Sequence, residues 1–505
     1  MKKGAEKYKA AATDDYSGAL PSKLLEENIA FFNGIFKKDS VLRQKKIIVH
    51  GVYNYECALF YMDGMVDSEL ITESIVKPLL LVQNERTEGS FADYIKNQVL
   101  FASETKSTEN VADMLRAVLY GDTLLLIDGC LTAITINTKG WRTRGISEPS
   151  DERILQGPRE GFDEAALLNV AMIRRKLLTP DLCTEMVRIG RRSDTILFIC
   201  YLDSLADGAM VAELKRRLSK INIDGILDTN YIAELIRDKP RSLFKTSGTT
   251  ERPDIVAARL LEGRIALIAD GTPVVLTFPY LFSENFQSDE DYYLNYAIAS
   301  VGRVLRYICF FLSVSIPAVF IAAATYHKEL LPTSLALTVT QLRGGVPFPA
   351  FAECILLIFV FEILKETGVR MPQSLGHALS IVGGLVVGQA AVEARIISAP
   401  MLIIVALAGI SGLMIPRLKG AVFYFRIIFV CLSALFGLYG YIAGFTLMLI
   451  HILQLSSLGV SSTASLNSAD KRSLKDTFWR VPWKNMHTRP IFCRNSVRME
   501  NKKSD

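Results

Sequence analysis

Long apolar stretches fill the second part of the chain, whereas residues 1–302 combine short apolar runs with many charged residues. Residues 307–326 form 20 consecutive positions without a formal charge, residues 396–416 form 21, and residues 427–450 are also uncharged. An α-helix rises 1.5 Å per residue, so about 20 residues cross the roughly 30 Å hydrocarbon core of a bilayer. The pattern predicts a water-soluble part followed by an α-helical polytopic membrane domain.

The apolar part divides into several candidate spans. The fifth is interrupted by Arg426, and the last two could instead be one long tilted helix hinged near Gly437–Gly440. We therefore predict about 4–6 spans. Lys and Arg concentrate at the ends that would lie beside the soluble part, which is the positive-inside pattern, and the N-terminal stretch lacks the apolar core of a signal peptide. The soluble part is thus predicted to be cytosolic, with spans near 304–326, 347–366, 373–394, 398–416, 421–438 and 440–456.

A spaced pattern occurs twice in the soluble part. The stretch around Asp63 recurs around Asp203, 140 residues later, and the pair Asp128-Gly129 recurs 142 residues later as Asp270-Gly271. Each Asp-Gly pair lies between apolar runs of strand character, which is typical of a β-hairpin. We predict an α/β tandem-repeat cytosolic domain. The expected organisation is an N-terminal polar segment (1–44), subdomain 1 (45–145), a linker helix (146–180), subdomain 2 (181–300), the membrane domain (301–456) and a basic cytosolic tail (457–505).

The joint between the two repeats contains the residues that we predict to couple them. Arg159 and Glu160 precede a helix-like run that contains Asn169 and ends in Arg174-Arg175-Lys176. Cations near a helix C-terminus complement its dipole. Two interpretations remain open: a helix that clamps the repeats through buried Arg and Glu pairs, or a segment that transmits a signal directly.

Polar residues at membrane depth are costly and therefore indicate functional sites. Glu353 and Gln389 are the candidate intramembrane polar residues, and Gln389 is expected to bond a neighbouring helix. One stripe of the predicted 373–394 helix combines small and polar side chains. Such a face lines a narrow aqueous path or allows close helix packing, and both interpretations stay open. The candidate pore-lining residues on this stripe are His377, Ser380, Gly384, Gly388 and Ala391.

Composition and motifs favour none of the common enzyme or nucleic-acid classes. The net charge of +5 is too small to indicate nucleic-acid binding, and the eight cysteines show no metal-ligand spacing. The sequence contains no P-loop, GxGxxG, HExxH or nucleophile elbow. We therefore predict no catalytic activity, no cofactor, no metal and no nucleic-acid partner.

Several short motifs together resemble one family. The chain resembles the A-type subunits of the bacterial spore germinant receptors, the GerA family, over about residues 45–490. Departures exist at Gln156 and Arg395, where such proteins often carry Arg and Gly. The stretches that carry the resemblance include Gly157-Pro-Arg-Glu-Gly-Phe162, Thr250-Glu-Arg-Pro-Asp254, Leu260-Leu-Glu-Gly-Arg264, Asp270-Gly-Thr-Pro273, Gly388-Gln-Ala-Ala-Val-Glu393 and Lys475-Asp-Thr477.

The resemblance implies the A subunit of a nutrient germinant receptor complex in the spore inner membrane. In such a complex the A subunit is thought to form an oligomeric, nutrient-gated cation channel, with a transporter-like B-type subunit and a C-type lipoprotein subunit as partners. The resemblance leaves a stage V sporulation AF-type relative, which aids ion release, as the alternative. A secondary transporter would need inverted hydropathy repeats, of which the membrane part shows none convincingly.

Overall fold

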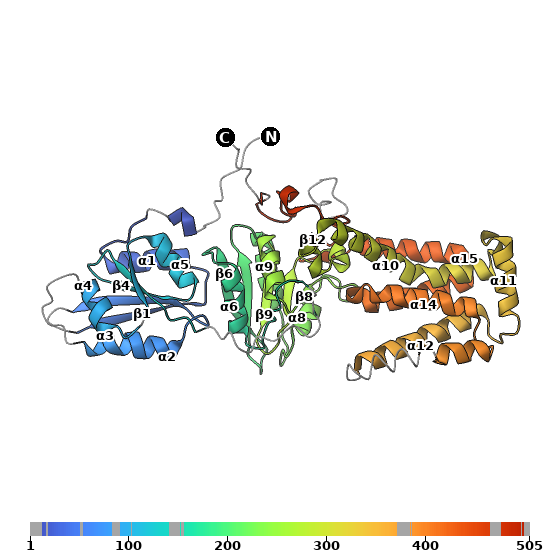
Figure 1. The fold of residues 1–505 in the computed structure, drawn as a ribbon, viewed down its shortest axis with the longest axis horizontal. Coiled ribbons are helices and arrows are strands. Elements are labelled where there is room, and N and C mark those ends of the chain that lie inside the picture. The colour runs from blue at the N-terminus through green and yellow to red at the C-terminus, as the bar shows by residue number, and fades with distance from the viewer. Residues whose placement is uncertain are drawn as a thin grey trace.

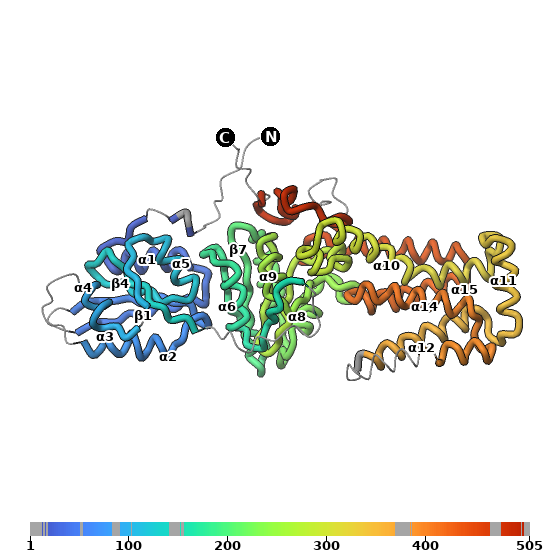
Figure 2. Tube along the Cα trace, viewed as in Figure 1, coloured from blue at the N-terminus to red at the C-terminus, as the bar shows by residue number. Residues whose placement is uncertain are grey.

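Three bodies follow one another along the molecule: two helix-covered β-sheets and then a bundle of long helices (Figure 1). In the tube view the colour passes through them in chain order, except that the red C-terminal residues return to the second sheet (Figure 2). This computed structural model describes residues 13–16, 19–50, 54–82, 91–102, 104–140, 152, 156–370, 384, 386–464, 476–495 and 497–498.

The first sheet has helices on both faces. On one face, side chains such as Phe60 and Leu126 pack against α1 (Leu25–Ile35) and α5 (Val111–Leu119). The other face packs against α2 (Ser68–Ile71), α3 (Lys77–Leu81) and α4 (Phe91–Tyr94). The strand order is β1-β2-β4-β5-β3, with β1 Leu42–Val49, β2 Tyr55–Met62, β3 Thr105–Thr108, β4 Thr123–Ile127 and β5 Ala133–Ile136.

The second sheet has the equivalent strand order, β6-β7-β9-β10-β8. Alternate residues of β7 face opposite sides, as a strand requires: Leu197 and Ile199 join one buried cluster, and Phe198 joins the other. Helices α6 (Ala166–Lys176) and α9 (Pro253–Leu261) cover one face, and α7 (Gly208–Leu218) and α8 (Thr229–Leu235) cover the other. The strands are β6 Leu182–Ile189, β7 Thr195–Leu202, β8 Gly248–Thr250, β9 Ile265–Ala269 and β10 Val275–Phe278.

The register and the turns also match between the sheets. Cys57 pairs with Ile127 in the first sheet, and Leu197 pairs with Ala269 in the second. These partners lie 140 and 142 residues further along, which are the offsets of the sequence repeat. In both hairpins an aspartate accepts a hydrogen bond from the first residue of a helix at 3.0 Å. The repeated Asp-Gly pairs therefore join each hairpin to its own first helix: Asp128 to Leu25, and Asp270 to Ala166.

Two predicted boundaries need correction. The segment 1–44 is not only a polar leader, because α1 buries Leu25, Ile29 and Phe32 in the first core. The segment 146–180 is not only a linker, since α6 is the counterpart of α1 and packs on the second sheet. Both helices carry their apolar residues at intervals of three and four, a weak signal in runs of only 11 residues.

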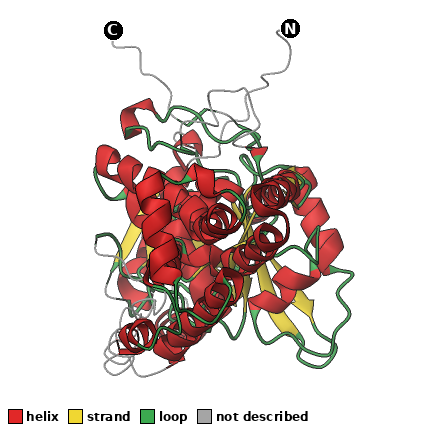
Figure 3. Cartoon of the chain, turned by 90° about the vertical axis from the view of Figure 1, so that its right-hand side faces the viewer, coloured by secondary structure: helices red, strands yellow, loops and turns green. Residues whose placement is uncertain are grey.

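The helical bundle begins directly after the second subdomain. Helix α10 (Tyr296–Thr325) runs away from the sheets and packs against α14 (Ala399–Leu413) and α15 (Lys419–Leu453). Helix α11 (Thr333–Arg343) crosses the far end, and α12 (Ala350–Arg370) lies beside α14 (Figure 1). Figure 3 shows several of these helices end-on and side by side.

Helix α15 is folded back on itself at a glycine. Gly437 has φ +62° and ψ −143°, a conformation that glycine adopts without strain. The ring of Phe429 before the break lies 5.8 Å from that of Tyr441 after it. Phe244 of the second subdomain contacts both Phe425 and His451, so both ends of α15 lie near the sheets. Of the two predicted arrangements, two shorter helices fit and one straight helix does not.

Among the described residues, two helices are long and apolar enough by length and composition to cross a membrane. They are Tyr296–Thr325 and Pro416–Leu453, and Ala399–Leu413 is a shorter apolar helix. Helix α12 has 21 residues but carries four charges near its ends and centre, including Glu353 and Lys365. The predicted count of about 4–6 spans therefore stays a prediction.

Candidate functional site at the junction of sheet and helices

A short connector, residues 279–292, joins the last strand of the second sheet to α10. It consists of two 3₁₀ turns, η4 (Phe282–Phe286) and η5 (Asp289–Tyr292). Each turn is closed by an acidic side chain that accepts a backbone N–H at its start: Glu284 from Leu281, and Asp291 from Ser288. Such caps hold short turns that propensity alone would not stabilise.

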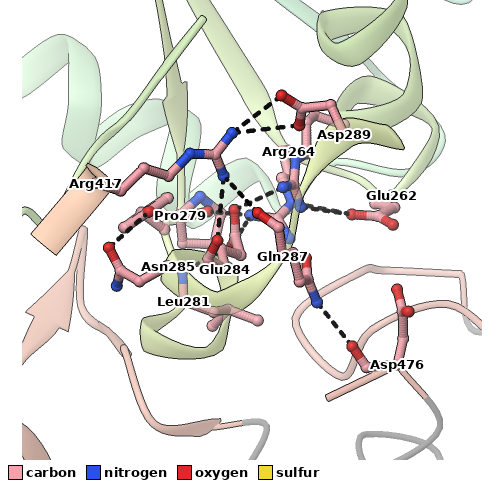
Figure 4. A network of polar contacts seen from close by, with 12 residues as sticks. Glu262, Arg264, Pro279, Leu281, Glu284, Asn285, Gln287, Asp289, Arg417 and Asp476 are labelled. Carbon is pink, nitrogen blue, oxygen red and sulfur yellow. Dashed lines mark hydrogen bonds and ion pairs between the residues drawn. The ribbon is translucent and has the colours of Figure 1, made fainter. Parts of the chain in front are cut away.

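Glu284 connects the sheet side and the helix side of this junction (Figure 4). Its carboxylate is 1% exposed and accepts from Arg264 at 2.5 Å, with Arg259 at 3.0 Å. Its backbone carbonyl accepts from Arg417, which lies in the turn between α14 and α15, at 3.1 Å. Arg417 also pairs with Asp289 of the connector at 3.1 Å. A displacement of α9 or β9 would therefore act directly on the turn that carries Arg417.

A second group of charges fixes the first turns of α10. Asp291 is 1% exposed and pairs with Arg303 at 2.8 Å and with Arg306 at 2.9 Å. Arg303 is fully buried and also pairs with Asp476, at 2.7 Å. Tyr292 donates its hydroxyl to the same Asp476 at 2.6 Å. One carboxylate thus holds two arginines of the helix, and the C-terminal residues complete the group.

The tail, which we define as residues 476–495 with 497 and 498, crosses this junction. Arg480 donates to the backbone carbonyls of Tyr292 and Leu294, just before α10. Arg489 donates to the Leu261 carbonyl at the end of α9, at 2.9 Å. Arg498 pairs with Glu262 at 3.4 Å. The described tail was predicted to face the membrane, but it lies on the second subdomain and the base of α10.

A separate loop of the second subdomain contacts α15. Phe244 inserts among the helices, where its ring lies 5.4 Å from that of Phe425. Ser242 shares a hydrogen bond of 3.0 Å with His451. The second subdomain therefore contacts the bundle at two places, the connector and this loop.

The predicted coupling residues lie elsewhere, at the joint between the subdomains. Asn169 is fully buried; it accepts from the Asp163 N–H at 2.8 Å and donates to the Asp163 carbonyl. Asn28 makes the same pair of bonds with Ser22 in the first repeat. This recurrence indicates a local fold role for Asn169.

The other two predicted residues lie in the loop before α6. Glu160 pairs with Lys176 at 2.8 Å, and Arg159 is exposed in the same loop. The buried ion pair that joins the subdomains is instead Arg174 of α6 with Asp39 of the first repeat. The expectation of a buried arginine at this joint fits, whereas its partner is an aspartate and not a glutamate.

The predicted pore stripe is only partly placed. His377 and Ser380 lie outside the described residues. A Cβ atom added to Gly384 would meet no atom within 4 Å, whereas one added to Gly388 would lie 3.6 Å from Leu402 of α14. Ala391 packs against the buried cluster of the bundle. In this chain the stripe thus faces α14 at Gly388, and open space at Gly384.

The two predicted polar residues of the bundle differ in setting. Glu353 is fully buried and accepts from the Ser398 hydroxyl at 2.7 Å, with Arg343 at 3.6 Å. Gln389 is exposed and donates to Glu393 at 2.9 Å, one turn along the same helix. The prediction that Gln389 bonds a neighbouring helix is wrong, because its side chain reaches the next turn before it could reach α14.

Arg426 is the largest polar group inside the bundle. It is 4% exposed and donates to the Ser313 carbonyl of α10 at 2.7 Å and to the Ala408 carbonyl of α14 at 3.0 Å. Its guanidinium also contacts the Ser313 hydroxyl. One side chain of α15 thereby bonds two other helices. The sequence marked Arg426 only as an interruption of a span.

Comparison with known proteins identifies the family. Residues 30–492 match the family described as Bacillus/Clostridium GerA spore germination protein. The chain belongs to the GerA family. The resemblance inferred from the short motifs is thus confirmed.

Two relatives and one solved structure illustrate the range of similarity within the GerA family. Spore germination protein KA of Bacillus subtilis is 40% identical over 468 residues, which cover 92% of this chain and 84% of that protein. Spore germination protein GerLA of Bacillus cereus is 34% identical over 86% of this chain and 89% of its own length. The crystal structure of the N-terminal domain of the A subunit of the Bacillus megaterium spore germinant receptor GerK3 has a TM-score of 0.42 and 30% identity, over 53% of this chain and 98% of that one.

The GerA motifs also contained a signal for the junction that we did not recognise from sequence. Leu260–Arg264 supplies Glu262 and Arg264, and the Lys475-Asp-Thr motif supplies Asp476. Arg303, Arg306 and Arg417 had been assigned only to the positive ends of spans. No periodicity shows that these distant segments meet, because their contacts form only in the folded chain.

Acidification should loosen the tail at Glu262. Burial alone would raise the pKa of Glu262, but Arg264, Arg259 and Arg498 outweigh it and hold the pKa below its ordinary value of 4.5. A carboxyl group with a lowered pKa stabilises the fold above its unfolded pKa, and this stabilisation disappears as the pH falls through the folded pKa. Trp483 lies 6.0 Å from the Arg498 guanidinium and reports on the contact. We expect the fluorescence of Trp483 to change below pH 4.5.

The control for this titration is Glu262→Gln, which cannot ionise. Both chains would carry Trp141→Phe and Trp479→Phe, so that Trp483 is the remaining tryptophan. The same transition in the Glu262→Gln chain would contradict the assignment.

Proposed function

We propose that the chain is the A subunit of a nutrient germinant receptor, and that it triggers spore germination as part of an oligomeric, nutrient-gated cation channel. Membership of the GerA family supports the receptor assignment. The apolar helices of the bundle support a membrane location. We place the protein in the spore inner membrane as a multi-pass protein, with both soluble subdomains in the cytosol.

The observation that carries the coupling part of this proposal is the double role of Glu284. Its side chain holds Arg259 and Arg264 of the second subdomain, and its carbonyl holds Arg417 between two helices of the bundle. Buried charge networks have few alternative arrangements, because an unpaired buried charge is costly. A change in the second subdomain would therefore be transmitted as a movement of the helix ends, and would not be absorbed in the loop.

The partners follow from the same assignment. We propose that the chain works with a transporter-like B-type subunit and a C-type lipoprotein, and that copies of it assemble around the conduction path. The open side of Gly384 is available for a neighbouring copy or for water. The stripe of His377, Ser380, Gly384, Gly388 and Ala391 remains our candidate lining of the pore.

Cysteine substitution tests the pore. In spores that carry the complete receptor, single cysteines at 377, 380, 384, 388 and 391 would be treated with a water-soluble thiol reagent during nutrient-triggered cation release. We expect the reagent to block release at position 384 most strongly, because that position has open space around it. Cysteine at Val387, which is exposed but lies off the stripe, is the matched control.

The contrary outcome is equally clear. If all five positions are inert, this helix does not line the conduction path. If position 387 reacts as strongly as position 384, the stripe has no special access to water. Native cysteines near the bundle, such as Cys309 and Cys431, would be replaced by alanine beforehand.

A further inference from the structure

A small cavity lies where the connector, the second subdomain and the tail meet. Its volume is about 80 Å³. The connector contributes Leu281 and Gln287, the second subdomain contributes Glu262 and Arg264, and the tail contributes Thr488 and Phe492. The cavity is therefore closed by the same three segments that link the soluble part to α10.

One wall of this cavity contains a hydrogen-bond acceptor without a donor. Gln287 is 9% exposed, and its Nε2 donates to the Asp476 carbonyl at 2.7 Å (Figure 4). This bond fixes the orientation of the amide, since the reversed amide would place two acceptors together. Among the described residues, the Gln287 Oε1 and the Thr488 Oγ1 have no hydrogen-bond partner. Buried polar atoms are normally satisfied, so both atoms call for a bound group.

The charges around the cavity already satisfy one another. Glu262 pairs with Arg264 at 3.1 Å and with Arg498 at 3.4 Å. Arg264 also pairs with Glu284. A charged ligand would find no unpaired counter-charge among these groups and would lose its hydration on entry. A neutral molecule with hydroxyl groups meets the two unpartnered atoms, and its carbon chain fits the apolar wall at Leu281 and Phe492.

The size of the cavity limits the ligand. One water molecule needs about 10–15 Å³ of such space, so 80 Å³ accepts a molecule of about five to seven non-hydrogen atoms. We propose that this cavity binds a small neutral polyol, and that the bound polyol holds the tail against the connector. Its regulatory consequence rests on the proposed function, whereas the binding itself does not.

Glycerol is a suitable probe, and binding would be measured on the purified full-length chain in detergent micelles by saturation-transfer NMR. We expect a saturable signal from glycerol. In the Gln287→Met chain, which keeps the volume and loses the acceptor, affinity should fall about tenfold, the effect of one lost hydrogen bond. Thr488→Val should weaken binding similarly, and it decides the matter if Gln287→Met does not fold.

A matched control separates this site from general effects of glycerol. Gln454 is a glutamine that accepts from Lys239 at a different contact between the second subdomain and the bundle. Gln454→Met should leave the glycerol signal unchanged. Equal signals in all variants, or no saturable signal in the wild-type chain, would overturn the proposal and leave water as the occupant. Loss of nutrient response with intact glycerol binding would instead count against the proposed function alone.

Discussion

Asp291→Ala is expected to release the base of α10 from the connector. The substitution leaves the fully buried Arg303 without its 2.8 Å partner and removes both contacts to Arg306. Removing one member of a buried ion pair costs about 3–5 kcal/mol, because the remaining charge stays desolvated. Asp476 remains beside Arg303 and offsets part of this cost. We expect the loss to be local, with faster hydrogen exchange of amides 296–306 in the full chain.

A surface ion pair provides the comparison. Asp113 pairs with Arg116 at 3.1 Å, and both side chains are about half exposed (52% and 53%). Asp113→Ala should change the exchange free energy by about 0–1 kcal/mol. If Asp291→Ala had an equally small effect, the buried group at the base of α10 would not anchor the helix.

Arg426→Met should affect conduction much more than stability. The guanidinium bonds oxygen atoms of Ser313 and Ala408, and among the described residues no carboxylate pairs with it. Replacing a buried charge with an apolar side chain of similar volume is often neutral, or stabilises by about 1–4 kcal/mol. A fixed positive charge inside a cation-conducting bundle opposes cation passage. We therefore expect the variant to release cations without nutrient while its unfolding temperature stays equal or rises.

Gly412→Ala separates charge from packing at the same place. Its new Cβ atom would lie 2.9 Å from the Ser313 Oγ and 3.4 Å from the Arg426 guanidinium, so the helices must move apart. This variant should lose stability while keeping the charge. If Arg426→Met behaved like Gly412→Ala, with lower stability and no leak, Arg426 would act only in packing.

The sequence predicted the regular parts of the molecule better than the contacts between them. The offsets of 140 and 142 residues anticipated the matched registers of the two sheets, because strand pairing and the Asp-Gly turns are local. The break at Gly437 was foreseen as one of two options. Helix α1 was missed because its apolar positions, Leu25, Ile29 and Phe32, make sense only with the first sheet present.

The junction could not be predicted from spacing. Glu284 lies 20 residues from Arg264 and 133 from the partner of its carbonyl, Arg417. No periodic pattern connects such positions, and ion pairs of this kind form only when the sheet and the bundle are both in place. Asn169 shows the opposite error, since a polar residue in a characteristic motif proved to repeat the local bonds of Asn28.

Nutrient-triggered cation release from spores that carry Glu284→Gln measures the coupling directly. Glutamine keeps the size of the side chain and an acceptor for the Leu281 N–H, but it loses the charge that holds Arg259 and Arg264. Glu213→Gln is the matched control, because Glu213 also pairs with two arginines, Arg216 and Arg217, on the surface of α7. With equal amounts of protein in the membrane, we expect Glu284→Gln to abolish release and Glu213→Gln to leave it unchanged. Normal release from Glu284→Gln spores would show that the signal does not pass through the connector.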